Sequence, residues 1–508
     1  MLAPFIIRRL FVSFFVLLGA TFIVYVLVAS AGDPRSALLE STDPGKANRI
    51  ATMTRNLSLD VPIIPRYFAW LGGALGCLIG KCDLGNTASG APVSGGLSVA
   101  MGSTLRLVVF ALVIAIVVGV SIGMITALRQ YSGLDYSVTF LAFLFFSLPV
   151  FWIAVLMKQF LAIKFNDWLK APSIPPWVIL ASAVVTGLIA AGVVGGDRRR
   201  RLAAFGGAAI AVGLLMTYFA VTDWFAEPAI GPVAMVVMSA ITAIAATALF
   251  AGFRSRVVLY ATLVTAAVGV ICYFALDSVL ADPTILVIIG LLVLALLVGA
   301  GIGAAMGGLY RSQAIKACML TAFGCGGLIF ASELLAALPA YSAEVNGVVV
   351  ATIGATTPNF SGNFWETTLD QLGHLLLPTI AIVLISIAAY TRYTRSSMLE
   401  VMNADYIRTA RAKGLTERTV VVRHGFRNAL IPITTIVALD VGGLIGGAII
   451  TETVFGWSGM GKYFNDALKI PDPNAVMGFF LVTGTAIVLF NMVADITYGF
   501  LDPRIRLS

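Results

Sequence analysis

Charged residues are scarce in this chain. Only 11% of its 508 residues are Asp, Glu, Lys or Arg, whereas 59% are hydrophobic. A soluble globular protein does not need so much apolar surface, so the composition predicts a polytopic helical membrane protein. The net charge of +8 is what basic cytoplasmic loops give such a protein, and it does not indicate nucleic-acid binding.

Residues that carry catalytic or metal chemistry are equally scarce. The two histidines, His374 and His424, lie far apart, and the five cysteines form no metal-binding pattern, which argues against zinc or haem chemistry. The chain has no Gly-x-x-x-x-Gly-Lys-Ser/Thr loop, so no nucleotide phosphate site of that type is predicted. We therefore expect a protein that is not an enzyme, binds no cofactor or metal itself and does not hydrolyse ATP alone.

Apolar runs long enough to cross a bilayer recur along the chain, since a span needs about 20 residues. The first run follows the start of the chain and is too long for the apolar region of a secretory signal, so we interpret it as a retained span. About twelve spans are predicted, at 5–28, 102–128, 136–163, 177–195, 202–222, 230–252, 257–276, 284–308, 317–337, 372–394, 429–452 and 475–499.

Lys and Arg collect in alternate connections, which predicts the orientation of the spans. The cytoplasmic set comprises Arg8, Arg9, Arg129, Arg198 to Arg201, Arg254, Arg256, Arg311, Lys316, the 392–427 region, Arg504 and Arg506. The opposite set is acidic or neutral and includes Asp223, Glu227, Asp277, Asp282, Glu344 and Asp472. An even number of spans then places both termini in the cytoplasm.

The region 29–101 is predicted to be the longest external loop, and it contains Cys77 and Cys82. Disulfides persist on the oxidising side of a membrane, so these two cysteines are either a small-loop disulfide or two unpaired thiols. Cys272, Cys318 and Cys325 lie in apolar segments and are interpreted as packing residues.

A short basic segment, "DYIRTARAKGL", runs from Asp405 to Leu415 between two apolar spans. Asp405 suits an N-cap, and Gly414 suits a helix stop. Ile407, Ala410 and Gly414 recur at helical spacing, which predicts a narrow face of small side chains that a partner could approach closely. One interpretation is an amphipathic helix that fits a groove on a partner. The other is a solvated loop that follows the positive-inside rule.

The longer stretch "DYIRTARAKGLTERTVVVRHGFRNALIP" resembles the cytoplasmic loop of binding-protein-dependent ABC importer permeases of the dipeptide, oligopeptide and nickel group. Arg408, Thr409 and Ala410 fall where the general importer motif has Glu-Ala-Ala, a departure usual in the peptide group, and Gly414 falls on its glycine. Further similar stretches are "FIIRRL", "GDP" at Gly32 to Pro34, "FFSLPVFWIAVL", "LLPTIAI", "TETVFGWSGMGKYFNDAL" and "LDPRIRLS".

The resemblance covers about 1–168 and 356–508 and implies a type I importer fold with about six transmembrane helices. The segment between these regions replaces a modest external loop of the family with roughly six further spans. The expected organisation is a first helix at 1–28, an external region at 29–101, core helices at 102–168, an inserted module at 170–355 and core helices at 356–508. The inserted module has almost no charge within its spans, which disfavours a substrate path and favours a scaffold or docking surface.

The resemblance also implies partners and a location. ATP and Mg would be bound by one or two separate ABC ATPase subunits, and a second homologous permease subunit and an extracytoplasmic solute-binding protein would complete the importer in the bacterial cytoplasmic membrane. Peptides, dipeptides or oligopeptides, would cross by alternating access. A coupling helix would be formed by Asp405, Tyr406, Ile407, Arg408, Thr409, Ala410, Arg411, Lys413, Gly414 and Leu415.

Polar and flexible positions inside the spans are candidates for the path itself. They are Asp440, Gly443, Gly447 and Glu452. Asp440 would meet a charged end of the substrate or pair at a helix contact, and Glu452 would lie at the external mouth or at a solvated helix end. Asp495 is expected to pair with a cytoplasmic arginine, and His374 to lie at the membrane surface.

A rival hypothesis is a self-contained secondary transporter or a membrane scaffold. Such a transporter normally has acids at mid-membrane in both halves, or an internal repeat with broken helices. This chain has one clear mid-span acid, Asp440, and no obvious repeat, which favours the importer permease.

Overall fold

The computed structural model describes residues 2–42, 44–252 and 255–501. Within these ranges, helices are the only regular elements besides one isolated bridge between Asn86 and Pro92. Arg254, Arg504 and Arg506, which belong to the predicted cytoplasmic set, lie outside the described residues.

Eleven helices of the described chain are long and apolar enough to cross a membrane, and a bent pair brings the number to twelve. The predicted all-helical membrane fold is confirmed. The six core spans are α1 (Leu2–Ala31), α5 (Val93–Leu128), α6 (Gly133–Ser147) with α7 (Val150–Met157), α16 (Phe364–Met402), α19 (Arg427–Ile445) and α22 (Pro473–Leu501).

The third span is not the single helix expected over 136–163. The axes on either side of Leu148 and Pro149 differ by 100°, because Leu148 is extended and a residue before proline avoids helical geometry. The second arm continues through a π-helical turn, η2 (Lys158–Ile163), into α8 (Lys164–Leu169).

The central contact of the core is the crossing of α5 and α16. A Cβ at Gly119 would lie 2.8 Å from Tyr390, and one at Gly123 would lie 2.6 Å from Thr394. Thr391 also donates a hydrogen bond of 3.2 Å to the Gly119 carbonyl. Glycine therefore lets the two backbones approach closely, as is common between membrane helices. Around this crossing, α22 packs on α19 and α1 packs on α22.

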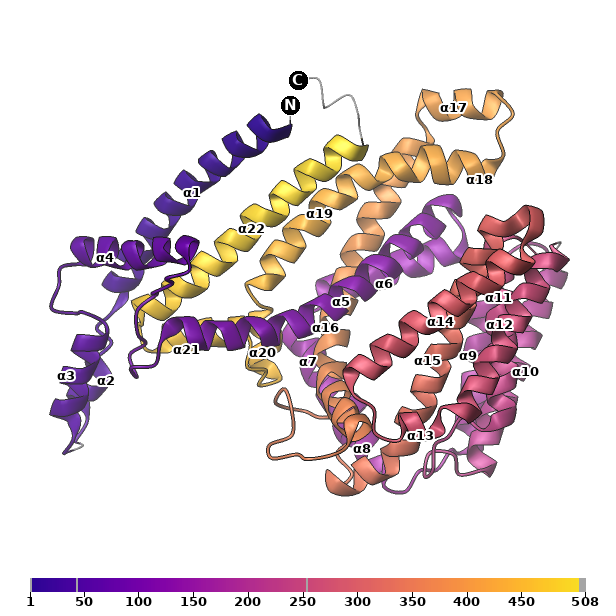
Figure 1. Ribbon diagram of the computed structural model, residues 1–508, viewed down its shortest axis with the longest axis horizontal. Coiled ribbons are helices and arrows are strands. Elements are labelled where there is room, and N and C mark those ends of the chain that lie inside the picture. Colours follow the sequence, from indigo (N-terminus) through magenta and orange to yellow (C-terminus); the bar gives the residue numbers. More distant parts are fainter. Residues whose placement is uncertain (1, 43, 253–254, 502–508) are drawn as a thin grey trace.

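The expected insertion forms a bundle beside the core (Figure 1), and we call residues 176–344 the satellite bundle. Its first two helices pair with each other, and its last four pack as a group. Their bounds are α9 (Pro176–Val194), α10 (Arg198–Val221), α11 (Pro232–Phe250), α12 (Arg256–Ala275), α14 (Ile285–Met306) and α15 (Arg311–Glu344), with the short turns α13 (Asp277–Leu280) and η3 (Gly308–Tyr310).

The region expected as a long external loop is largely helical. It contains α2 (Ser36–Glu40), α3 (Lys46–Asn56), α4 (Ile63–Gly76) and η1 (Cys77–Ile79), and α5 already begins at Val93. Cys77 and Cys82 are joined by a disulfide. Tyr67 and Trp70 of α4 pack against Tyr25 of α1, so α4 packs against the first span, although it is too short to cross the membrane.

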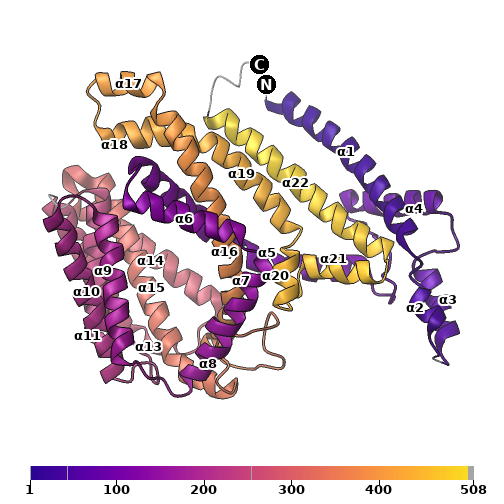
Figure 2. The same cartoon turned by 180° about the vertical axis from the view of Figure 1, so that it is seen from behind.

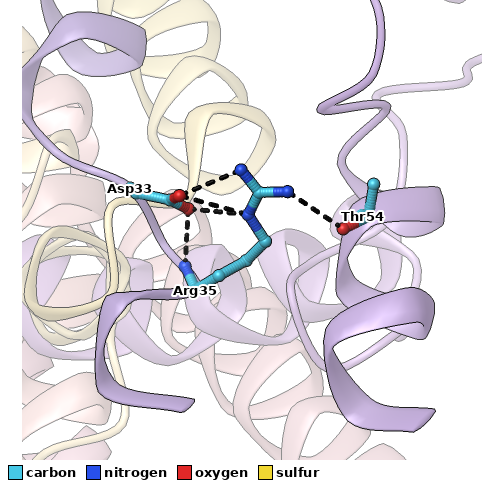
Figure 3. A network of polar contacts seen from close by, with 3 residues as sticks. All are labelled: Asp33, Arg35 and Thr54. Atoms are coloured by element: carbon cyan, nitrogen blue, oxygen red, sulfur yellow. Dashed lines mark hydrogen bonds and ion pairs between the residues drawn. The ribbon is translucent and has the colours of Figure 1, made fainter. Parts of the chain in front are cut away.

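The "GDP" segment fixes the end of α1. Asp33 accepts hydrogen bonds from the backbone and guanidinium of Arg35, and Arg35 reaches Thr54 of α3 at 3.5 Å (Figure 3). Gly32 faces Pro471, just before α22, with only 3.4 Å left for a Cβ. These contacts tie the segment after α1 to α3 and to the start of the last span.

The two ends of the molecule are distinct. The described chain near both termini lies at the same end as α17 (Asp405–Ala412), whereas α8 and α13 lie at the other end (Figures 1 and 2). Arg418 reaches the carbonyl of Leu249 at the first end, and Trp365 donates a 2.6 Å hydrogen bond to the carbonyl of Leu280 at the other. The described chain near the termini and α17, which are predicted to share one side of the membrane, therefore lie at one end of the structure.

Candidate functional site

The basic segment of the sequence forms a separate short helix. Helix α17 (Asp405–Ala412) connects the end of α16 to the chain that leads into α19, through α18 (Glu417–Thr419) and a π-helical stretch, η4 (Val420–Phe426). Gly414 has φ +74°, so its predicted role as a helix stop is confirmed. The N-cap is Ala404, and Asp405 is the first helical residue with no capping hydrogen bond. The prediction that Asp405 caps this helix was wrong.

The face predicted to meet a partner points inward. Ile407 is fully buried and Ala410 nearly so, and both pack against Val420 of η4 with Met402 beside them. Ile407 and Ala410 therefore pack against side chains of the same chain and are not free to enter a groove on a partner. The side chains that α17 and its C-terminal turn expose are Asp405, Tyr406, Arg408, Thr409, Arg411, Ala412, Lys413 and Leu415.

Ion pairs orient this exposed face. Arg411 contacts Glu417 at 2.7 Å, and the hydrogen bonds from its guanidinium to that carboxylate raise the pKa of Arg411. Arg408 lies 3.8 Å from Asp405 one turn earlier. Such exposed pairs contribute little to stability, so the burial of Ile407 and Ala410 holds the helix in place.

The helix that carries α17 is braced by a buried ion pair. Arg395 of α16 donates hydrogen bonds of 2.7 and 2.9 Å to the carboxylate of Asp135 at the start of α6. The same carboxylate accepts a 3.0 Å bond from the backbone of Tyr131, and Ser132 caps α6. A bidentate pair fixes geometry as well as contributing energy. The end of α16 therefore cannot move without α6.

Two of the candidate path residues face open space or a neighbouring helix. Gly443 is exposed, and no atom lies within 4 Å of where its Cβ would be. Leu439, one turn earlier on α19, is also exposed. The Asp440 carboxylate lies beside the buried hydroxyl of Tyr390 on α16. This stretch of α19 thus presents an uncovered strip with one acid at its edge.

The other two candidates, Glu452 and Gly447, lie in packed contacts between elements. Glu452 is fully buried in α20 (Ile449–Val454). It accepts hydrogen bonds from Thr104 of α5 at 2.8 Å and from the backbone of Lys462 in α21 (Met460–Lys469) at 3.0 Å. The alternative of a solvated helix end was therefore wrong. Gly447 has φ +96°, and a Cβ there would lie 2.4 Å from the Gly461 nitrogen, so it permits close packing against α21.

The side chain of His374, which is expected near the membrane surface, is enclosed by the protein itself. It is buried, and its ring contacts the Gly354 carbonyl at 3.0 Å and the Thr357 hydroxyl at 3.2 Å. Asp370 accepts hydrogen bonds from Thr357 and from Tyr341 of α15. This cluster holds the connection between the satellite bundle and α16. By contrast, Asp495 pairs with Arg9 at 2.5 Å, as the sequence predicted.

Sequence reasoning missed the residues that join distant elements. Asp135 was detectable in part, because Ser132 three residues earlier forms a capping signature with it. Asn166 was not detectable: it exchanges two hydrogen bonds with the backbone of Val350, at 2.9 and 3.0 Å, across 184 positions of sequence. No local pattern encodes a contact of that range.

Part of the chain is similar to a known protein family. Residues 283–507 match the family described as binding-protein-dependent transport system inner membrane component. The match starts inside the segment expected as an insertion, so it includes α14 and α15 as well as the last three core spans.

Three relatives illustrate the similarity. The oligopeptide transport system permease protein OppB of Mycobacterium tuberculosis (strain H37Rv) is 42% identical over 155 residues, which is 30% of this chain and 48% of that protein. The dipeptide transport system permease protein DppB of Escherichia coli K12 is 48% identical over 145 residues, 28% of this chain and 42% of that protein. The DppB of Alkalihalophilus pseudofirmus is 42% identical over 181 residues, 35% of this chain and 54% of that protein.

The chain thus spans about half the length of the curated relatives that it matches. Residues 283–507 are similar to this family of transport components, and the resemblance of the chain to permeases of peptide ABC importers is confirmed.

Proposed function

We propose that this protein is the transmembrane permease subunit of an ATP-driven importer that moves dipeptides or oligopeptides by alternating access. Its family domain and the peptide permeases to which it is similar support this assignment. The chain would bind no cofactor, and ATP and Mg would reside on one or two partner ATPase subunits. A second homologous permease subunit and an external solute-binding protein would complete the importer.

The observation that carries the proposal is the placement of α17. It projects at one end of the molecule (Figure 1), carries an exposed polar and aromatic face, and is packed by its other face on the chain between α16 and α19. A force applied to the exposed face would therefore reach two spans directly. The Asp135–Arg395 pair would pass it on to α6.

The exposed face of α17 has the composition of a protein interface. Aromatic residues and arginine dominate binding energy at such contacts, and Tyr406 with Arg408 and Arg411 supplies both. We assign the ATPase contact to these side chains with Thr409, Lys413 and Leu415, whereas Asp405 orients Arg408, Gly414 ends the helix, and Ile407 and Ala410 anchor it.

The uncovered strip of α19 is the proposed path. Gly443 and Leu439 are exposed in the part of the chain that the structure describes, and Asp440 lies between them in the sequence. A second permease subunit facing this strip would enclose a passage with an acid in its wall. The end that carries α17 and the termini would face the cytoplasm of a bacterium, with the disulfide of Cys77 and Cys82 outside.

The exposed aromatic ring of α17 gives the sharpest test. Tyr406→Ala removes it, and Tyr310→Ala in η3 is the matched control, because the two rings are 44% and 50% exposed. We expect Tyr406→Ala to lower the amount of ATPase that co-purifies with the tagged chain, and ATP-driven peptide uptake by vesicles, about tenfold, as for an interface hot spot. Tyr310→Ala should change neither.

The rival class predicts a different result. A secondary transporter would purify without ATPase activity and would drive uptake from a proton gradient alone. That outcome would overturn the proposal. So would normal uptake and normal assembly in Tyr406→Ala and in each of the other variants of the exposed face.

A further inference from the structure

An apolar cavity of about 330 Å³ lies inside the satellite bundle, away from α17 and α19. Helices α12, α14 and α15 form its walls, and Trp365 at the start of α16 closes part of it. The volume falls within the range of about 300–1,000 Å³ typical of ligand pockets. The lining includes Leu276, Ala295, Cys325, Gly326, Gly327 and Phe330.

Small residues leave this space open. No atom lies within 4 Å of where a Cβ would stand at Gly326 or Gly327. The polar groups of the wall are already satisfied, because Trp365 donates to the Leu280 carbonyl and Thr265 to the Ala261 carbonyl. The interior therefore offers no partner to a polar ligand, and suits an unbranched hydrocarbon chain.

Two acidic residues lie next to the cavity lining in the sequence. Asp277 directly follows Leu276, and Glu333 lies one helical turn beyond Phe330 on α15. Glu333 is partly buried, and Asp277 lies near enough to act on its charge. Within the described parts of the chain, neither acid has a hydrogen bond or ion pair from its side chain. Two like charges held together without a cation favour a positively charged ligand group.

We propose that the satellite bundle binds a phospholipid with an amine headgroup, placing one acyl chain in this cavity and the ammonium group against Asp277 and Glu333. Phospholipids of the bilayer would surround these helices, because α12, α14 and α15 are all long enough to span it. The bound chain would also touch Trp365, which joins the bundle to α16. This site is independent of the proposed peptide path.

The test uses the full chain reconstituted in phosphatidylglycerol vesicles. These contain a trace of phosphatidylethanolamine or of phosphatidylglycerol, each with a photoactivatable group on one acyl chain. After illumination, labelled peptides are mapped by mass spectrometry. We expect labelling concentrated at 265–276 and 322–330, with the amine lipid favoured about twofold to fivefold, as for one partly exposed charge pair.

Two variants test binding of the acyl chain and binding of the headgroup separately. Gly326→Leu fills the cavity and should reduce labelling there to the level of the exposed face of α10, whereas Gly301→Leu on α14, where a Cβ also has free space but faces outward, should change nothing. Glu333→Gln should remove the preference for the amine lipid and keep the labelling. If Gly326→Leu folds poorly, Gly327→Leu serves instead.

Three results would overturn the proposal. The first is cavity labelling no stronger than labelling of outward-facing helices. The second is equal labelling by the two lipids in the unmodified chain. The third is loss of cavity labelling once the other subunits of the complex are present, which would assign the space to a partner's helix.

Discussion

Arg395 and Asp135 form a bidentate ion pair at 2.7 and 2.9 Å between α16 and the start of α6. The aspartate side chain is only 3% exposed and the arginine side chain 28%. Because α16 leads directly into α17, this pair determines which spans follow any movement of that helix. Loss of one partner would leave the other charge partly desolvated.

We expect Asp135→Ala to lower the free energy of unfolding by about 1–3 kcal/mol, less than for a fully buried pair because water reaches Arg395. Thermal unfolding in detergent measures this. Asp135→Ala combined with Arg395→Met should recover part of the loss, since no charge is then left alone. The exposed Asp466–Lys469 pair is the control, and Asp466→Ala should have little effect. Equal, small effects of both alanine variants would show that the buried pair is not a brace.

The two faces of α17 predict opposite results for the same new side chain. Ala410→Trp forces a ring against Val420 and Met402, and overpacking costs about 1–3 kcal/mol, so the helix should detach and become sensitive to protease. Thr409→Trp adds the ring on the exposed face and should leave protease sensitivity unchanged, while still weakening assembly with the ATPase. Limited proteolysis beside co-purification separates the two. Ala410→Trp with normal proteolysis would contradict the packing described here.

The sequence was sufficient for the features that depend on local pattern. Twelve apolar runs predicted the spans, and Gly414 predicted the end of α17, because hydrophobic length and positive φ leave local signals. Helix α16 is longer than its apolar run, because Asn363 and Glu366 form a capping box that starts the helix at Phe364, before the apolar stretch.

Features that depend on distant contacts were not predictable. The face formed by Ile407 and Ala410 was identified correctly, but its partner could not be, since any surface would satisfy the same spacing. Glu452 and His374 were assigned to water or the membrane surface because nothing near them in sequence reveals Thr104 or Thr357. The break at Leu148 and Pro149 had a local signal in the proline, which an apolar count alone ignores.

Glu452 and Thr104 form the second brace to be tested. Thr104 donates to Glu452 and also accepts from the backbone of Met460, so Thr104→Val breaks both bonds, and Glu452→Gln replaces an acceptor with a donor. Each should cost about 1–3 kcal/mol, the penalty of an unsatisfied buried group.

These two substitutions distinguish a structural role of Glu452 from a role in the peptide path. If the carboxylate is a brace, the two substitutions lower thermal stability and the double variant loses less than the sum. If Glu452 instead meets the substrate, Glu452→Gln would reduce transport with an unchanged melting temperature, and Thr104→Val would not reproduce it.

Removal of the satellite bundle tests whether it is a separate unit. The side chain of Lys170 lies 3.4 Å from where a Cβ of Gly347 would stand, so the chain enters and leaves the bundle at neighbouring points. Deletion of 172–345 with a short polar linker should therefore leave the core able to insert and to assemble with the ATPase. Trp365→Phe should accompany it, because the deletion removes the Leu280 carbonyl that accepts the indole N–H.

The boundary of this deletion is the decisive detail. Val350 must stay, because it supplies both hydrogen-bond partners of buried Asn166, and Thr357 must stay to hold Asp370 and His374. Extending the deletion to 355 should cost about 1–3 kcal/mol for each orphaned polar group and abolish assembly. Size-exclusion chromatography and ATPase co-purification compare the two. The shorter deletion variant could insert in the membrane and still bind no ATPase, just like the longer one. In that case the bundle is an integral part of the permease core.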